Sequence, residues 1–202
     1  MACFAADEMK PKKQRVFVAG ATGYIGKHVA AELVRRGHDV VCFARKGPQS
    51  QERLRELGAE LRFGDVTSRA SIEADGLRWE RFDVVVSCLA SRSGAPKDAW
   101  LVEHQANANL LEACKAAGTS HFVLLSAICV QKPLLEFQRA KLAFERALVA
   151  SGLTYSIVRP TAFFKSLAGQ VKAVKRGKPF VVFGDGELTS CKPISERDLA
   201  CF

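Results

Sequence analysis

Short apolar segments alternate with longer amphipathic segments along most of the chain, and this alternation constrains the fold more than any other feature. Six segments of strand length lie at residues 15–20, 39–44, 59–65, 83–90, 121–127 and 154–160, and a seventh is expected at 179–184. Strands that are apolar on both faces are typical of parallel sheets covered by helices on both sides. The sequence therefore predicts an α/β fold with a doubly wound parallel sheet.

The segments between these strands carry helical signals. Residues 26–37, 104–118 and 136–152 have apolar positions at helical spacing, and each ends at a glycine, as helix C-termini often do. The segment 91–100, SRSGAPKDAW, is expected to be a loop that leaves the fourth strand. Ligands of such sheets lie beyond the carboxyl ends of the strands, so this loop is well placed to contact one.

Composition narrows the function classes. The net charge of +9 suits an anionic ligand, but the charges are scattered and lack interleaved aromatic residues, which argues against nucleic acid as a partner. Seven cysteines form no C-x-x-C pair and four histidines are isolated, so we expect reduced thiols and no metal site. The longest apolar runs are shorter than the roughly 20 residues that cross a bilayer.

A glycine-rich loop follows the first strand directly and precedes the first helix. The segment VFVAGATGYIGKH places Gly20, Gly23 and Gly26 where a tight turn, a close approach to a pyrophosphate and helix–strand packing need them. The same glycines can form a merely structural turn, but strand, loop and helix come here in the order of a dinucleotide site. The predicted site also includes the loop residues Thr22, Tyr24 and Ile25.

The second strand ends in Arg45 and Lys46, without a carboxylate. An acid at this point would bind the ribose hydroxyls of NAD, whereas basic residues accept the 2′-phosphate of NADP. The sequence therefore favours NADPH as cofactor. The alternative is that Arg45 is a solvated loop residue.

Two further strand ends complete the predicted cofactor site. Asp65 and Val66 follow the third strand, where they can reach the adenine; Asp65 can equally cap the next turn. The end of the fourth strand passes over the pyrophosphate and nicotinamide ribose, and contributes Cys88, Leu89 and Ala90. We expect Cys88 to pack rather than to act as a nucleophile, because no histidine or metal partner can be placed beside it.

Ser126 ends the fifth strand, Lys141 lies on the following helix, and VRP at 158–160 ends the sixth strand with Pro160. With the glycine loop, these residues resemble the atypical, extended type of short-chain dehydrogenase/reductase, which has a Rossmann fold. Within that superfamily, residues 121–145 and 154–200 closely resemble the divinyl chlorophyllide a 8-vinyl reductases of plants and algae. The resemblance runs from about Arg15 to the last residue.

The resemblance implies an NADPH-dependent chloroplast enzyme that reduces the 8-vinyl group of a chlorophyll-precursor pigment to ethyl. Residues 1–14 hold two acids, a proline and three lysines without an apolar run, so we expect a disordered lead-in without a clear transit peptide. The globular pattern begins at Arg15, which predicts a Rossmann domain at 15–202, and the resemblance implies that residues 151–202 start a substrate-covering region. Members of the family continue beyond the 192–200 segment. We therefore expect this chain to be truncated at its C-terminus.

The predicted catalytic residues are Lys141 and Ser126. A tyrosine four residues before Lys141 is the proton donor of carbonyl reductases, but this chain has Phe137 there. A vinyl group has no oxygen to protonate, so the missing hydroxyl is consistent with such a substrate. Lys141 is expected to hold the nicotinamide ribose, or else to be a surface lysine; Ser126 orients substrate or nicotinamide, or else satisfies a strand-end backbone group.

The sequence is also compatible with other functions. The chain fits an NADPH-binding regulator or assembly scaffold that has lost its acid, or a reductase of another conjugated small molecule. The segment 164–178 is a basic helix, which is either a solvated face or a patch for a propionate or for the anionic surface of the thylakoid or envelope membrane.

Overall fold

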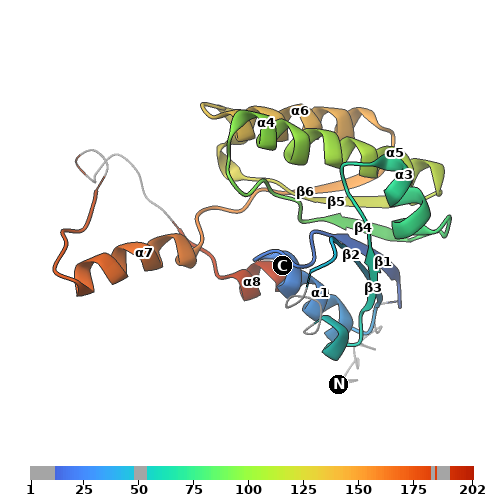
Figure 1. Ribbon diagram of the computed structural model, residues 1–202, viewed down its shortest axis with the longest axis horizontal. Helices are drawn as coiled ribbons and strands as arrows, with labels where there is room; N and C mark the ends of the chain where they lie inside the picture. The colour runs from blue at the N-terminus through green and yellow to red at the C-terminus, as the bar shows by residue number, and fades with distance from the viewer. Residues whose placement is uncertain (1–11, 48–53, 183–184, 186–191) are drawn as a thin grey trace, which may run out of the picture.

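The computed structural model describes residues 12–47, 54–182, 185 and 192–202, and its centre is a six-stranded parallel sheet (Figure 1). The strand order is β3-β2-β1-β4-β5-β6, so the winding reverses between β1 and β4. The doubly wound prediction is confirmed. The strands are β1 (Arg15–Ala19), β2 (Asp39–Ala44), β3 (Glu60–Phe63), β4 (Val84–Ser87), β5 (His121–Leu125) and β6 (Thr154–Val158).

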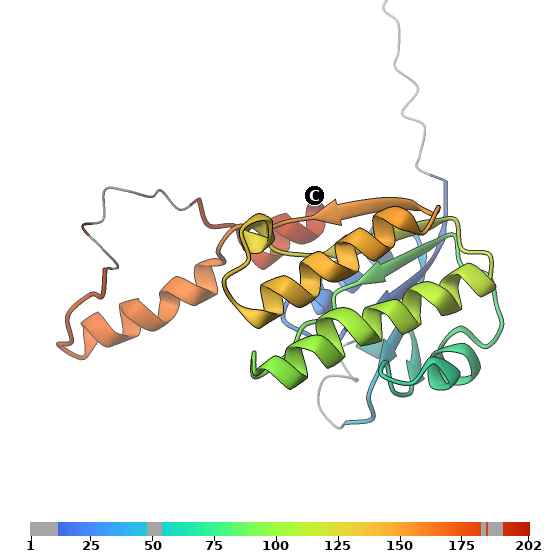
Figure 2. The same ribbon diagram turned by 90° about the horizontal axis from the view of Figure 1, so that it is seen from above.

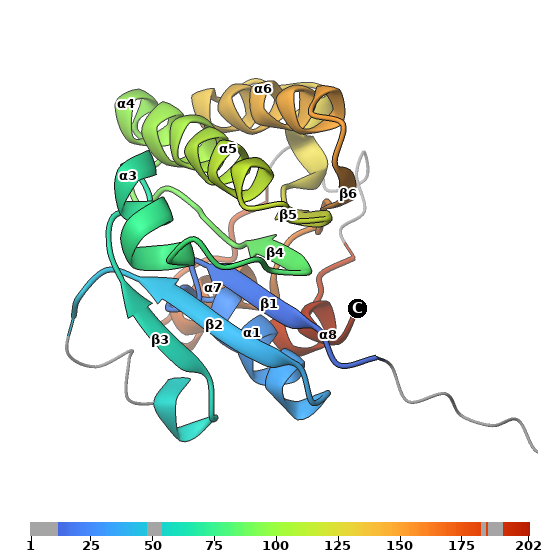
Figure 3. The ribbon, with the colours of Figure 1, turned by 90° about the vertical axis from the view of Figure 1, so that its right-hand side faces the viewer.

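Helices cover both faces of the sheet (Figure 3). One face carries α1 (Gly26–Arg35) and α8 (Glu196–Cys201), which pack against each other. The opposite face carries a longer series: α3 (Arg69–Ser71), the π-helix η1 (Ile72–Leu77), α4 (Pro96–Ala99), the π-helix η2 (Trp100–Ala106), α5 (Asn107–Ala116) and α6 (Glu136–Ala150). A 3-10 turn, η3 (Ile128–Gln131), follows β5.

Two apolar layers hold these helices to the sheet, because successive strand residues point to opposite faces. Along β1, Val16 and Val18 belong to the layer under α1, whereas Phe17 packs in the layer on the other side. That second layer also contains Phe43, Phe122 and Phe144, all fully buried. Burial on both faces explains why the strands read as continuous apolar runs.

The helix α7 (Phe164–Lys175) projects away from this body (Figures 1 and 2). Its basic residues are exposed, as a solvated face would be; membrane contact stays a prediction. No helix within the described ranges is both long and apolar enough to cross a membrane.

Three segments differ from the sequence prediction or lie partly outside the described residues. Residues 179–182 form no strand, and 183–184 lie outside the described residues. The expected loop at 91–100 is wrong in its second half, because Pro96 starts α4 at a position that proline favours, and the carboxylate of Asp98 accepts from the N–H groups of Arg92 and Ser93. Of the lead-in, only residues 12–14 are described; the carbonyl of Gln14 accepts from the N–H of Asp39.

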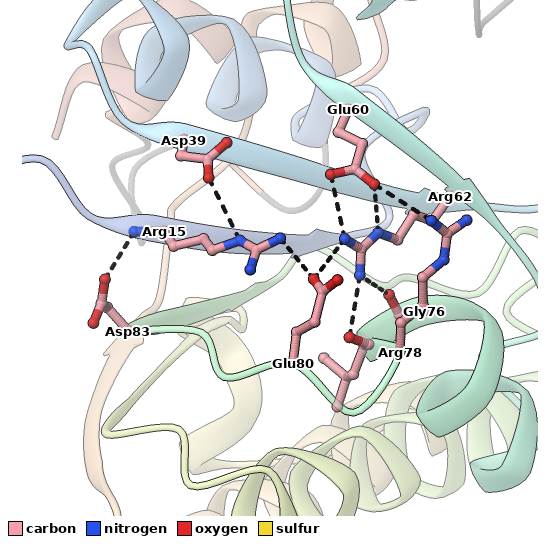
Figure 4. Close-up of polar contacts among 9 residues, drawn as sticks. Arg15, Asp39, Glu60, Arg62, Gly76, Arg78, Glu80 and Asp83 are labelled. Atoms are coloured by element: carbon pink, nitrogen blue, oxygen red, sulfur yellow. Dashed lines mark hydrogen bonds and ion pairs between the residues drawn. The ribbon is translucent and has the colours of Figure 1, made fainter.

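The sequence analysis did not predict a cluster of charged side chains at the amino ends of the strands (Figure 4). Arg62 is 2% exposed; its guanidinium donates to the carbonyls of Gly76 and Leu77 at 2.8 and 3.1 Å and to Glu80 Oε2 at 2.7 Å. Glu60, on the same strand, accepts two further bonds from Arg62. The cluster thereby joins β3 to the C-terminal end of η1, on the side away from the glycine loop.

Candidate functional site

The glycine loop lies between β1 and α1, and two of its glycines are required by the chain itself. Gly20 has φ +80°, and a Cβ there would lie 2.7 Å from the carbonyl oxygen of Cys88. A Cβ on Gly26 would lie 2.2 Å from the carbonyl oxygen of Gly20. At Gly23 a Cβ would meet only that same oxygen, at 3.1 Å, so this exposed position is open toward a ligand.

The end of β4 lies directly against this loop. The N–H of Cys88 donates to the carbonyl of Ala19 at 2.9 Å. Cys88 and Leu89 are buried, whereas Ala90 is exposed. Burial raises the pKa of the Cys88 thiol to about 12, so it stays protonated at neutral pH, in agreement with a packing role.

A pocket of about 450 Å³ lies at the carboxyl ends of β2 and β3. The predicted residues Arg45, Lys46 and Asp65 line it together. It is completed by Phe63, Gly64, Ser71 and Asp75. The structure therefore brings the two basic residues and the acid of the sequence prediction to one place, at the ends of β2 and β3.

Asp65 performs the capping task that the sequence left as an alternative. Its Oδ1 accepts from the N–H and from the hydroxyl of Thr67, both at 2.8 Å. The bond from the N–H of Thr67 and, to a smaller extent, the bond from its hydroxyl lower the pKa of Asp65. Val66 packs against the core layer under α5. Contact of either residue with an adenine stays a prediction.

Tyr24 links the glycine loop to the end of the chain. Its hydroxyl donates to Glu196 Oε2 at 2.7 Å, and this bond is the main cause that raises the pKa of Tyr24. The ammonium of Lys165 lies 4.1 Å from the centre of its ring. Ile25 is buried at the start of α1, and Thr22 is half-buried. No local pattern predicts the contact of Tyr24 with Glu196, because the two residues are 172 positions apart.

Lys141 is buried on α6, so the alternative of a surface lysine is wrong. Its Nζ lies 2.7 Å from Oε2 of Glu103, and it donates to the carbonyl of Leu125 at 3.3 Å. Glu103 was not among the predicted residues; its only sequence signal is a carboxylate amid apolar helix positions. Phe137 is half-buried in the first turn of α6, one turn before Lys141.

Ser126 follows β5. Its N–H donates to the carbonyl of Val158 at 2.7 Å, but its hydroxyl oxygen is buried and has no hydrogen-bond partner within the described residues. The side chain thus does not satisfy a strand-end backbone group. A buried hydroxyl without a partner indicates a place for a ligand group. Pro160, at the end of VRP, accepts from the N–H of Ile128 at 3.1 Å and so holds the turn η3.

These features lie along the carboxyl edge of the sheet, where Rossmann folds bind dinucleotides. The residues fit such a ligand: Gly23 leaves room for a pyrophosphate, a pocket that includes Arg45 and Lys46 lies at the β2 end, and a hydroxyl without a partner among the described residues lies beyond β5. The described residues contain no cluster of three or more histidines, cysteines and acids that could hold a metal ion. Fold and site define the class of Rossmann dinucleotide-binding proteins.

Comparisons with known proteins agree with this class. The family model described as NAD(P)H-binding matches residues 20–200. The solved structure of UDP-glucose 4-epimerase from Thermotoga maritima superposes with a TM-score of 0.77 over 93% of this chain and 71% of that one, at 20% identity. That likeness shows the fold alone. The chain belongs to the NAD(P)H-binding family.

Two curated relatives are more specific. The chloroplastic divinyl chlorophyllide a 8-vinyl-reductase of Cucumis sativus is 56% identical over 95% of this chain and 49% of its own length. The photosystem II assembly factor Ycf39 of Guillardia theta is 27% identical over 93% of this chain and 58% of its own length. The chain thus spans about half the length of the curated relatives it matches. Its similarity to the 8-vinyl reductases confirms the resemblance seen in the sequence.

Proposed function

We propose that this chain is the nucleotide-binding part of a chloroplast reductase that converts the 8-vinyl group of divinyl chlorophyllide, or of a related chlorophyll precursor, to ethyl. The observation that carries the proposal is the 56% identity to the cucumber reductase over 95% of the chain. Phe137 supports it, because a reductase of a carbon–carbon double bond has no substrate oxygen to protonate.

The proposed cofactor is NADPH. Arg45 and Lys46 line the pocket beyond β2, where the 2′-phosphate of NADPH would lie. Arg45 also contributes to lowering the pKa of Asp65 across this pocket, so its positive charge acts within it. Two cations at this end favour the doubly charged phosphate over the uncharged ribose hydroxyl of NADH.

In the proposed reaction, bound NADPH supplies the hydride. Lys141 uses the N–H that remains beside its contacts with Glu103 and Leu125 to hold the nicotinamide ribose hydroxyls. The hydroxyl of Ser126 orients the nicotinamide or the pigment. Phe137 offers a flat apolar surface and no proton, so the proton of the reduction comes from water or from another side chain.

The test is a chimera in which residues 15–202 replace the matched segment of the cucumber reductase. Incubated with NADPH and divinyl chlorophyllide, the chimera is expected to form the monovinyl product, followed by absorbance. The 202-residue chain alone is titrated with NADPH in parallel. Cofactor binding without product would reject the reductase proposal.

The alternative is a non-catalytic regulator or assembly scaffold. The 27% identity to the photosystem II assembly factor Ycf39 favours it among non-enzymatic functions. A chimera that binds NADPH yet reduces neither divinyl chlorophyllide nor another conjugated compound would support this alternative.

A further inference from the structure

A buried carboxylate lies behind the lysine of the candidate site. Glu103, in the middle of η2, is 3% exposed. Its Oε1 accepts from the N–H and from the hydroxyl of Ser91, at 2.9 and 3.1 Å. Its Oε2 lies 2.7 Å from Nζ of Lys141. One side chain therefore joins three elements: η2, the segment that follows β4, and α6.

Burial makes this arrangement specific. A carboxylate out of water is costly unless a cation and hydrogen-bond donors compensate it, and Glu103 has both. Lysine has a flexible stem and a compact charge, so its ammonium stays in one place only where fixed acceptors hold it. The carbonyl of Leu125 accepts a hydrogen bond from Lys141, and the carboxylate of Glu103 places the opposite charge beside the ammonium. Together these two contacts restrict where the ammonium of Lys141 lies.

We propose that Glu103 is a positioning residue of the reductase. It holds Lys141 on one side of the cofactor and, through Ser91, the segment 88–90 on the other. The inference rests on the proposed function, because the contact of Lys141 with the nicotinamide ribose belongs to that proposal. The inference adds Glu103, which the sequence analysis did not select, and states that Glu103 acts through Lys141.

The competing explanation is that the pair merely stabilises the fold, and α6 offers a matched control for it. Glu145 is also 3% exposed and lies one turn beyond Lys141. Its carboxylate binds the guanidinium of Arg159 in a two-point ion pair, with Nε 3.1 Å from Oε1. Both glutamates are thus buried and paired, but only Glu103 contacts Lys141.

The experiment measures the Kd of the 202-residue chain for NADPH, by fluorescence titration, together with its Tm. Glu103→Gln keeps an acceptor for Ser91 but removes the charge facing Lys141, and we expect it to raise the Kd by about fivefold or more. Glu103→Gln and Glu145→Gln are expected to lower the Tm by similar amounts. Glu145→Gln, however, is expected to leave the Kd for NADPH within about twofold of the original value. Glu103→Asp, which keeps the charge, is expected to recover part of the affinity.

A double substitution tests the route. If Glu103 acts through Lys141, Glu103→Gln changes the Kd of a Lys141→Met variant by no more than about twofold. Additive effects of Glu103→Gln and Lys141→Met on the Kd would overturn the inference. It would also be overturned if Lys141→Met weakened NADPH binding while Glu103→Gln and Glu103→Asp left the Kd unchanged. Unchanged NADPH binding in Lys141→Met would instead overturn the proposed role of Lys141, so the two failures are distinguishable.

Discussion

Phe137 is the residue that separates this site from that of a carbonyl reductase. It lies one turn before Lys141 on α6, at the position of the missing tyrosine, and is half-buried. Lys141 keeps its ion pair with Glu103 without that tyrosine. The site therefore keeps a buried, paired lysine and lacks the acid that would protonate an oxygen.

Restoring the tyrosine tests this interpretation. In the chimeric reductase, Phe137→Tyr is expected not to accelerate vinyl reduction, because the vinyl group offers no oxygen for the added hydroxyl to protonate. Lys141→Ala is expected to raise the KM for NADPH and to lower kcat together, because the nicotinamide loses its anchor. Product absorbance measures both. A large gain in rate from Phe137→Tyr would contradict the account of the missing hydroxyl.

Arg45 decides the choice of cofactor in our proposal. One charge-assisted contact contributes roughly 1.5–3 kcal/mol, so Arg45→Ala should weaken NADPH binding by about tenfold or more and barely change NADH binding. Arg146→Ala, on the exposed side of α6, serves as the control. Titration with both cofactors gives the answer, and equal losses for NADPH and NADH would argue against a 2′-phosphate contact.

In the loop between β1 and α1, Gly23 is predicted to leave space for a ligand, whereas Gly26 is needed for packing within the chain. Gly23→Val is expected to abolish dinucleotide binding with the sheet intact, because the added atoms enter the space of the pyrophosphate. Gly26→Ala is expected to lower the Tm instead, because its Cβ would overlap the carbonyl oxygen of Gly20 at 2.2 Å. Circular dichroism and NADPH titration distinguish them; retained affinity in Gly23→Val would count against the nucleotide site.

The contact between β3 and η1 depends on Arg62. Replacing it by methionine leaves the carbonyls of Gly76 and Leu77 without their donor, and the free energy of unfolding should fall by roughly 2–3 kcal/mol. Arg78→Met, which removes an ion pair 3.7 Å long at a 54% exposed side chain, should cost no more than about 1 kcal/mol. Urea unfolding measures both. Equal losses of unfolding free energy in the two variants would show that the buried contacts of Arg62 contribute no more than the exposed ion pair of Arg78.

Carboxylates paired in the native protein contribute to its stability in acid. Bonds from Arg35 and Arg36 lower the pKa of Glu32 from its ordinary 4.5 to about 2. Arg62 lowers that of Glu80, and the hydroxyl of Tyr24 lowers that of Glu196. The unfolded chain binds more protons than the native protein between these values, so stability rises with pH there.

We therefore expect the Tm to be highest above pH 4.5 and to fall as the pH drops toward 2. Glu32→Gln should flatten part of this slope, because the glutamine cannot be protonated in that range. Thermal unfolding at a series of pH values measures the effect. An unchanged slope in Glu32→Gln would mean that its pairing with Arg35 and Arg36 does not contribute to acid stability.

The sequence determined the features that depend on local pattern. Apolar runs gave all six strands, glycines marked the helix ends, and the glycine loop appeared in its strand–loop–helix context, because side-chain periodicity and backbone freedom are properties of neighbouring residues. Ser126, Arg45 and Lys46 could be selected because each follows a strand, and Lys141 could be selected because it lies four residues after the position of the missing tyrosine. Pattern failed at 96–100, where a proline starts a helix instead of ending one.

The contacts that hold those residues in place depend on how the elements pack together. Glu103 meets Lys141, and Tyr24 meets Glu196, only because the strand order β3-β2-β1-β4-β5-β6 brings distant segments to one edge of the sheet. The burial of Lys141 and of the Ser126 hydroxyl likewise depends on which elements pack over them. Such contacts follow from the arrangement of elements in space, which local spacing along the chain does not encode.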